Sequence, residues 1–235
     1  MLTSHALSND SAFSHHTPPI VLIGGGGHAS VVAEILLQQG REIVAVVTPD
    51  SIAERPVFQG IKHLSSDTQV AKFKPSDVKL VNGVGMLPRS TIRQKINGYF
   101  LALGYQFDTV IAPSAVVSPY ATLKQGTQVL AGAIVQSGAS IGAHSIINSK
   151  ALIEHDCVLG EYNHIAPGAT MCGQVKTKCN VFVGAGAIVT PNIAIGENAI
   201  VGAGSCITRS IDAGVITRPA ATTLDMVEAK EGRRG

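Results

Sequence analysis

The chain has 235 residues, of which 45% are hydrophobic and only 14% charged, and its formal net charge at pH 7 is +2. This length allows one large domain or two modest ones, and a charged content well below the usual value of about a quarter indicates aliphatic, repetitive structure with surfaces buried against other subunits. Because basic residues cluster only in the Arg233-Arg234 tail, the composition does not indicate a protein that binds nucleic acid or an anionic membrane.

The first residues carry no targeting pattern. Residues 1–18 have neither a basic start nor an apolar run, so we expect a flexible extension rather than a signal peptide. No stretch reaches the roughly 18 uninterrupted apolar residues of a membrane span. The four cysteines show no C-x-x-C pairing, which favours reduced structural thiols in a cytoplasmic protein.

Residues 19–107 are predicted to form a Rossmann-like α/β domain. The order is strand, glycine loop, helix and strand, followed later by a further strand, a loop and a helix. We expect strands at 19–23, 43–47 and 78–81, and loops at Gly24–His28 and 83–85. One helix is expected around 31–36 and ends before Gly40, and a second is expected at 91–103, capped by Ser90 and ended by Gly104.

The glycine loop Gly24–His28 is the first candidate for ligand binding. It opens a helix, and the free N–H groups and dipole at a helix start suit a phosphate. The pattern Gly24-x-Gly26-x-x-Ala29 fits the dinucleotide fingerprint, but a dehydrogenase needs a longer α/β chain than 19–107. The alternative is a tight strand-to-helix turn with no ligand.

Residues 108–220 follow a period of six. Sixteen of the seventeen positions counted from Ile111 in steps of six are apolar, and the exception is Thr177. Small residues recur two places before them. The apolar positions are Ile111, Val117, Leu123, Val129, Val135, Ile141, Ile147, Ile153, Leu159, Ile165, Met171, Val183, Val189, Ile195, Val201 and Ile207, and the small ones include Ala133, Ala139, Ala151, Ala169, Ala187 and Ala199.

A β-solenoid explains this period, whereas an α-helix or an alternating strand does not. Each six residues form one short strand and one turn, with the aliphatic and the small residue pointing inward. Three such sides close a triangular coil of eighteen residues, and each coil stacks on the next. We therefore predict a left-handed parallel β-helix over 108–220, with a loose tail at 221–235.

The combination of these two halves resembles the sialic acid O-acetyltransferase-like family. The resemblance rests on the glycine loop that ends in His28, and on hexapeptide repeats that carry Ile153-Glu154-His155-Asp156-Cys157 and Asn163-His164-Ile165. It implies an acetyl-CoA-dependent N-acetyltransferase of nucleotide-linked amino sugars (UDP-, GDP- or dTDP-linked 4-amino-4,6-dideoxy sugars for surface glycans). It also implies a homotrimer with active sites in clefts between neighbouring β-helices, and no metal.

His155 is the candidate general base. It lies two places after the inward Ile153, which predicts a coil corner, and Gly173 one coil later leaves space for a substrate beside the imidazole. A positioned His that takes the amine's proton is worth roughly 10²- to 10⁴-fold. The resemblance implies that Asp156 fixes the His155 tautomer and that Asn148 orients the sugar amine. The alternative is a solvated corner histidine beside a turn Asp and a turn Asn.

The resemblance also implies the remaining site residues. His164, Gly173, Ala185 and Ala203 match cofactor-lining positions, although Ala185 and Ala203 are equally explained by turns that require small residues. The matching substrate-lining positions are Gly26, Gly27, His28, Thr48 and Gly85. Many relatives carry an acidic pair after the second strand. This chain has Thr48-Pro49-Asp50 instead, which leaves the nucleotide base open.

Three alternatives remain. The same base and cofactor could acetylate a hydroxyl of a sialic-type or other sugar. A zinc hydratase of the carbonic-anhydrase type would need three converging histidines, for which His144, His155 and His164 are available at spacings of eleven and nine residues. A non-catalytic trimeric scaffold would need neither a His-Asp pair nor a phosphate-type loop.

Overall fold

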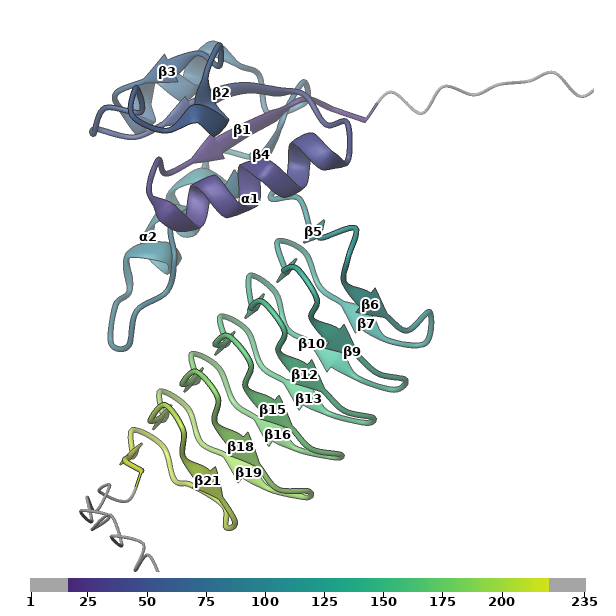
Figure 1. Cartoon of the computed structure of the whole chain (residues 1–235). Coiled ribbons are helices and arrows are strands. Elements are labelled where there is room, and N and C mark those ends of the chain that lie inside the picture. The colour runs from purple at the N-terminus through teal and green to yellow at the C-terminus, as the bar shows by residue number, and fades with distance from the viewer. Residues whose placement is uncertain (1–16, 220–235) are drawn as a thin grey trace, which may run out of the picture.

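The computed structural model describes residues 17–219. It consists of an α/β domain followed by a long parallel β-solenoid, and the domain lies beside the first coils (Figure 1). The predicted fold class is confirmed. The extension 1–18 falls almost entirely outside the described residues, and so does the tail 221–235. Within residues 17–219 no helix is long and apolar enough to cross a membrane.

The α/β domain is built on a parallel four-stranded sheet in the order β3-β2-β1-β4. Two helices and two short 3-10 turns accompany it. Helix α2 begins after Thr91, whose side chain makes no capping hydrogen bond, while the Ser90 hydroxyl oxygen accepts from the Ile92 N–H at 3.5 Å. The elements are β1 (Ile20–Ile23), α1 (Gly27–Gln38), β2 (Ile43–Val47), η1 (Pro56–Phe58), β3 (His63–Leu64), η2 (Asp67–Lys72), β4 (Lys79–Asn82) and α2 (Ile92–Ala102).

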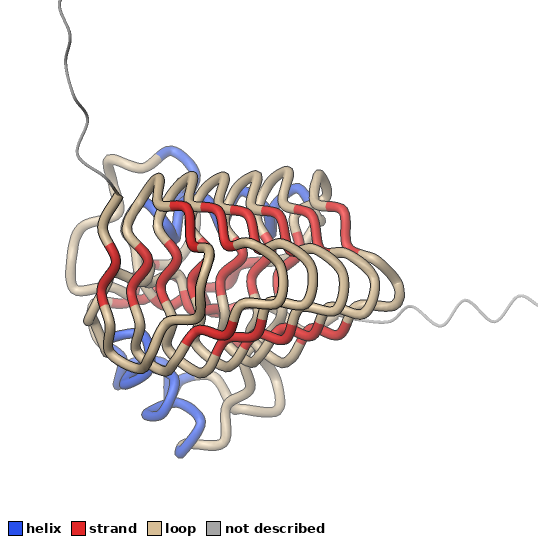
Figure 2. Tube along the Cα trace, turned by 90° about the horizontal axis from the view of Figure 1, so that it is seen from below, coloured by secondary structure: helices blue, strands red, loops and turns tan. Residues whose placement is uncertain are grey.

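The solenoid has three faces, each a stack of parallel two-residue strands (Figure 2). Face 1 contains β5 (Val110–Ile111), β8 (Gln128–Val129), β11 (Ile146–Ile147), β14 (His164–Ile165), β17 (Phe182–Val183), β20 (Ile200–Val201) and β22 (Ile216–Thr217). Face 2 contains β6 (Val116–Val117), β9 (Ile134–Val135), β12 (Leu152–Ile153), β15 (Thr170–Met171), β18 (Ile188–Val189) and β21 (Cys206–Ile207). Face 3 contains β7 (Thr122–Leu123), β10 (Ser140–Ile141), β13 (Val158–Leu159), β16 (Lys176–Thr177) and β19 (Ala194–Ile195).

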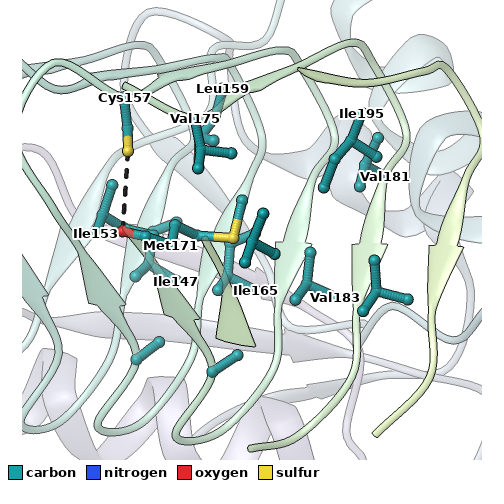
Figure 3. Close-up of a cluster of buried hydrophobic side chains, with 14 of the residues drawn as sticks. Ile147, Ile153, Cys157, Leu159, Ile165, Met171, Val175, Val181, Val183 and Ile195 are labelled. Carbon is teal, nitrogen blue, oxygen red and sulfur yellow. Dashed lines mark hydrogen bonds between the residues drawn. The ribbon is translucent and has the colours of Figure 1, made fainter. Parts of the chain in front are cut away.

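The register between coils is eighteen residues, as the period predicts. Ile147 pairs with Ile165, and Ile153 pairs with Met171. The second residue of each strand points inward and stacks on its equivalent in the neighbouring coil, which gives the column of aliphatic side chains in Figure 3. Cys157 lies in this core, and burial raises the pKa of its thiol to about 11. It is therefore a structural thiol.

Thr177, the exception in the repeat, occupies an inward position and is satisfied there. Its hydroxyl oxygen accepts a hydrogen bond from the buried Asn163 amide and another, at 3.2 Å, from the Gly160 N–H. Asn163 also accepts from the Val181 N–H at 2.6 Å. A buried polar group is tolerated when its hydrogen bonds are made. This pair therefore interrupts the aliphatic stack with polar groups that have hydrogen-bond partners.

The outward positions of faces 1 and 2 are both largely apolar, but only face 1 is covered. Val110 and Ile146 on face 1 are fully buried in one cluster with Val32 and Leu36 of α1. On face 2, Val116 and Ile188 are 62% and 45% exposed. The α/β domain thus packs on the first coils of face 1 and leaves face 2 open.

Candidate active site

His155 lies in the turn between faces 2 and 3, which we call corner 2–3. Its Nδ1 is 2.9 Å from Asp156 Oδ2, and both side chains are 58% exposed. Because a carboxylate only accepts, Nδ1 carries the hydrogen and Nε2 keeps a free lone pair. The dyad expected from the sequence is formed. The expected space over Gly173 is not: a Cβ added at Gly173 would lie 2.6 Å from His155 Nε2, so the imidazole itself fills that space.

A cavity of about 770 Å³ lies where the α/β domain meets face 1. It runs from the carboxyl ends of β1, β2 and β4 to the solenoid. All five predicted substrate-lining residues line it, and so do Asn148 and His164 from the solenoid. The five are Gly26, Gly27, His28, Thr48 and Gly85.

Backbone conformation and close approach explain the first two of the four glycines in the loop. Gly24 has φ +104°, a conformation that favours glycine. A Cβ on Gly25 would lie 2.6 Å from Thr48 Cγ2, whereas Gly26 and Gly27 face open space. Among residues 17–219 no side chain caps the start of α1. Because Gly26, Gly27 and His28 line the cavity, the first N–H groups of this helix can bind an anion there.

A polar chain ties the glycine loop to the solenoid. His28 Nε2 is 2.7 Å from Gln128 Oε1, and Gln128 Nε2 donates to the Asn82 carbonyl at 2.7 Å. Burial, and to a lesser degree the charge of Arg93, lowers the pKa of His28 to about 4. His28 is therefore a neutral residue that fixes the wall of the cavity.

His164 occupies the solenoid end of the cavity. Its Nδ1 donates to the Met86 carbonyl at 2.9 Å, which leaves Nε2 to accept from Asn148 Nδ2 at 3.0 Å. Asn148 Oδ1 in turn accepts from the Ser149 N–H at 2.8 Å. Burial lowers the pKa of His164 to about 4. The neutral ring therefore holds both Asn148 and the loop after β4.

Arg93 on α2 holds the same loop from behind. It is 3% exposed, and its Nη1 donates to the carbonyls of Asn82 and Val84, both at 2.8 Å. Burial lowers its pKa to about 10. Figure 1 shows this loop, between β4 and α2, projecting from the domain along the solenoid. The walls of the cavity are therefore held in place by residues of both the α/β domain and the solenoid.

The structure divides the predicted residues between two corners. Asn148 lies at the turn between faces 1 and 2, corner 1–2, in the cavity. Ala185 and Ala203 lie exposed at the same corner, in a column joined by backbone hydrogen bonds such as Gly204 N to Ala185 O at 2.9 Å. His155, Asp156 and Gly173 lie at corner 2–3, so face 2 separates the proposed base from the cavity of its own chain.

Sequence reasoning missed Gln128, Met86, Arg93 and Asp67. Of these, Met86 and Asp67 line the cavity. A signal existed for Gln128. Its outward row on face 1 also contains Val110 and Ile146, and apolar residues at outward positions indicate a surface that another element or another subunit covers. No comparable pattern marks Arg93 or the loop residue Met86.

The three histidines of the hydratase alternative are dispersed. His144 is buried at the corner between faces 3 and 1, stacked on Tyr162, while His155 and His164 lie at corner 2–3 and on face 1. Among residues 17–219, no three His, Cys, Asp or Glu side chains gather to hold a metal ion.

Comparison with known proteins gives a consistent family. Residues 19–100 match the PglD N-terminal domain, and residues 175–209 match the bacterial transferase hexapeptide repeats. The curated GDP-perosamine N-acetyltransferase of Escherichia coli O157:H7 is 28% identical over 102 residues, or 43% of this chain and 46% of the relative. That match therefore spans about half the length of the curated relative.

Two acetyltransferases are among the solved structures that match over most of both chains. One is a histidine-to-asparagine variant of perosamine N-acetyltransferase from Caulobacter crescentus in complex with CoA and GDP-perosamine, 34% identical, covering 84% of this chain and 92% of that one, with a TM-score of 0.76. The other is the acetyltransferase domain of PglB from Neisseria gonorrhoeae in complex with acetyl coenzyme A, 30% identical, covering 88% and 99%, with a TM-score of 0.76. The chain belongs to the family of hexapeptide-repeat acetyltransferases that contains perosamine N-acetyltransferase and PglB.

Proposed function

We propose that this chain transfers the acetyl group of acetyl-CoA to the amino group of a nucleotide-linked amino sugar. The observation that carries the proposal is the single cavity that joins the glycine loop at the start of α1 to Asn148 and His164 of the solenoid. A glycine loop suits a diphosphate, and the solenoid end then receives the sugar.

The far end of the cavity suits the nucleoside. Asp50 and Asp67 follow β2 and β3 there, and carboxylates accept hydrogen bonds from ribose hydroxyls or from base N–H groups. We take a GDP-linked 4-amino-4,6-dideoxy sugar as the first candidate, because the relative from Caulobacter crescentus binds GDP-perosamine and guanine presents adjacent N–H donors.

The chemistry assigned to the dyad is proton transfer. The sugar amine attacks the thioester carbonyl carbon and forms the new C–N bond, while His155 Nε2 takes the amine's proton. The tetrahedral intermediate then expels the CoA sulfur, which receives the proton from Nε2. Asp156 keeps the hydrogen on Nδ1 throughout, so that Nε2 remains the basic atom.

The site is assembled between copies of the chain. His155 and Gly173 at corner 2–3 form one half, and the cavity with Asn148, Ala185 and Ala203 at corner 1–2 forms the other. A homotrimer in which corner 2–3 of one subunit meets corner 1–2 of its neighbour completes three identical sites. The open apolar row of face 2, with Val116 and Ile188 exposed, supplies surface to be buried in such an assembly. With acetyl-CoA as co-substrate, we assign the protein to the cytoplasm.

The first experiment tests the reaction. Purified protein is assayed for thiol release from acetyl-CoA with UDP-, GDP- and dTDP-linked 3- and 4-amino sugars, and with the matching hydroxy sugars. We expect an amide product and the highest kcat/KM with a GDP-linked 4-amino sugar. An ester product from the hydroxy sugars alone would establish the O-acetyltransferase alternative, and no turnover of any sugar would favour the scaffold.

The second experiment tests the shared site. His155→Ala and Asn148→Ala variants are each purified, unfolded, mixed in equal amounts and refolded, with each variant refolded alone as the control. Random trimers then contain wild-type sites, formed by His155 from one variant and Asn148 from the other, in about one site of four. Recovery towards that fraction supports the inter-subunit site, whereas no recovery above the separate variants contradicts it.

A further inference from the structure

The dyad at corner 2–3 lies between two glycines. Gly138 is one coil before Asp156, and Gly173 is one coil after His155. A Cβ built on Gly138 would meet Asp156 Oδ1, and one built on Gly173 would lie 2.6 Å from His155 Nε2. Both approaches fall inside the 3.0 Å that real Cβ atoms keep. Both side chains therefore lie against a neighbouring coil, in space that a side chain at position 138 or 173 would occupy.

The backbone does not require the glycine at position 138. Its φ is +75°, in the left-handed region. The equivalent turn positions in the next three coils of the same corner are Asp156, Gln174 and Asn192, with φ values of 59°, 62° and 62°. This turn therefore accepts residues with a side chain. The carboxylate of Asp156 is what excludes a side chain at 138.

The same argument applies to Gly173. Its φ is not in the left-handed region, and the equivalent positions one coil before and after are His155 and Pro191. Its turn therefore also accepts side chains. What differs at 173 is the His155 ring lying against it.

We propose that Gly138 and Gly173 are positioning residues that form a slot for the His155–Asp156 dyad. The inference rests on the proposed function, because it assumes that His155 is the base. The slot acts through two fixed contacts. With Gly138, the carboxylate stays beside Nδ1 at 2.9 Å, and with Gly173 the imidazole lies against the glycine, in the space that a Cβ would occupy.

A side chain at 138 acts on the dyad more than on the fold. The group that it meets is the end of the Asp156 side chain, which is half exposed and can rotate into solvent. Rotation takes the carboxylate away from Nδ1. The ring then loses its tautomer preference, and a fraction of molecules carries the hydrogen on Nε2, where it blocks proton transfer from the amine.

The test compares Gly138→Ala with Gly214→Ala. Gly214 has φ +70°, and no atom of residues 17–219 lies within 4 Å of an added Cβ. It lies in the last coil at the corner between faces 3 and 1, so it controls for the backbone cost alone. We expect similar losses of Tm in both variants. We expect kcat to fall about tenfold in Gly138→Ala only, with the KM for acetyl-CoA unchanged.

A double-mutant cycle separates the slot from a general structural effect. In an Asp156→Ala background the clash is gone, so Gly138→Ala should lower kcat no further. An equal loss in both backgrounds would overturn the inference, and so would equal activities of Gly138→Ala and Gly214→Ala.

A readout without activity keeps the slot distinct from the proposed function. Crystal structures of wild type and Gly138→Ala at one pH should show the Nδ1–Oδ2 contact kept in the first and lost in the second. If the wild type acetylates no sugar, the proposed function fails while this comparison still stands. If the contact survives in Gly138→Ala, the slot fails whatever the enzyme does.

Discussion

Two histidines nine residues apart occupy opposite environments. The His155 side chain is 58% exposed at corner 2–3, and within the described part of the chain its one hydrogen-bond partner is Asp156. His164 is 7% exposed under the α/β domain, and both of its ring nitrogens have partners. The hexapeptide phase explains the difference: His155 comes two residues after an inward position, in the turn, and His164 comes one residue before an inward position, on a covered face.

This difference assigns their chemistry. A base needs one nitrogen free to take a proton, and in His155 the contact with Asp156 uses Nδ1 and leaves Nε2 for this role. A ring with both nitrogens bound, and with a pKa lowered to about 4 by burial, stays neutral and holds its neighbours. We therefore assign proton transfer to His155 and the positioning of Asn148 and Met86 to His164.

The largest expected effect is on turnover in His155→Ala. Loss of the base should lower kcat by about 10²- to 10⁴-fold, while the loss of an exposed side chain should change the free energy of unfolding by less than about 0.5 kcal/mol. Steady-state kinetics and thermal unfolding measure the two. Glu197→Ala, an exposed residue at the equivalent turn position of another corner, is the matched control. Near-normal kcat in His155→Ala would remove it from the mechanism.

His164→Ala should affect the free energy of unfolding more strongly than kcat, the reverse of His155→Ala. The substitution leaves the Met86 carbonyl and the Asn148 amide without their partner, and a buried group deprived of its hydrogen bond costs about 1–3 kcal/mol. Denaturant unfolding measures this cost, with His155→Ala as the reciprocal control. Because the loop after β4 and Asn148 line the cavity, the KM for the nucleotide sugar should rise more than kcat falls. If His164→Ala were as stable as wild type but inactive, the two assignments would have to be exchanged.

The protein should lose stability in acid because three of its histidines are buried in the neutral form. Burial lowers the folded-state pKa of His28, His144 and His164 to about 4, below the value of about 6.5 in an unfolded chain. As pH falls from about 6.5 to about 4, these histidines bind protons in the unfolded state but stay neutral in the folded state. The free energy of unfolding therefore decreases in this pH range, and the full stabilisation is present above about pH 6.5. Tm measured across these pH values should fall, and it should fall less steeply in His164→Gln. A Tm that rises or stays level would contradict the shifts.

The sequence predicted the solenoid well because its rule is local and repeated. Each coil meets only its neighbours, so the phase of an aliphatic residue is enough to place it inside, as Ile153 and Ile165 show. The same phase located His155 in a turn. Thr177 broke the pattern, and its reason, a hydrogen bond from Asn163 fourteen residues away, depends on the three-dimensional path of the coil.

The cavity was harder to predict because it depends on how two units pack. The glycine loop and His28 were found from the strand-loop-helix order, but the partners of His28 and His164 are Gln128 and Met86, which are 100 and 78 residues away. The sequence placed a gap over Gly173 where the structure has the imidazole. Spacing gives the identity of the stacked residue, whereas the direction of a side chain depends on what it contacts.

The smallest expected effect on the exposed corner is that of Asp156→Asn. An Asn held rigidly can turn its NH₂ towards the imidazole and enforce the wrong tautomer, with losses of about 10⁴ in a buried triad. Here the side chain is 58% exposed, so the amide is free to rotate and to present its oxygen to Nδ1–H. Orientation then survives, and only the charge is lost. We expect kcat to fall about tenfold or less, and less than in Asp156→Ala, where no acceptor remains. Both variants are measured side by side at saturating acetyl-CoA. Equal losses would mean that the side chain at position 156 cannot rotate freely, and that corner 2–3 restricts it as tightly as the covered face restricts His164.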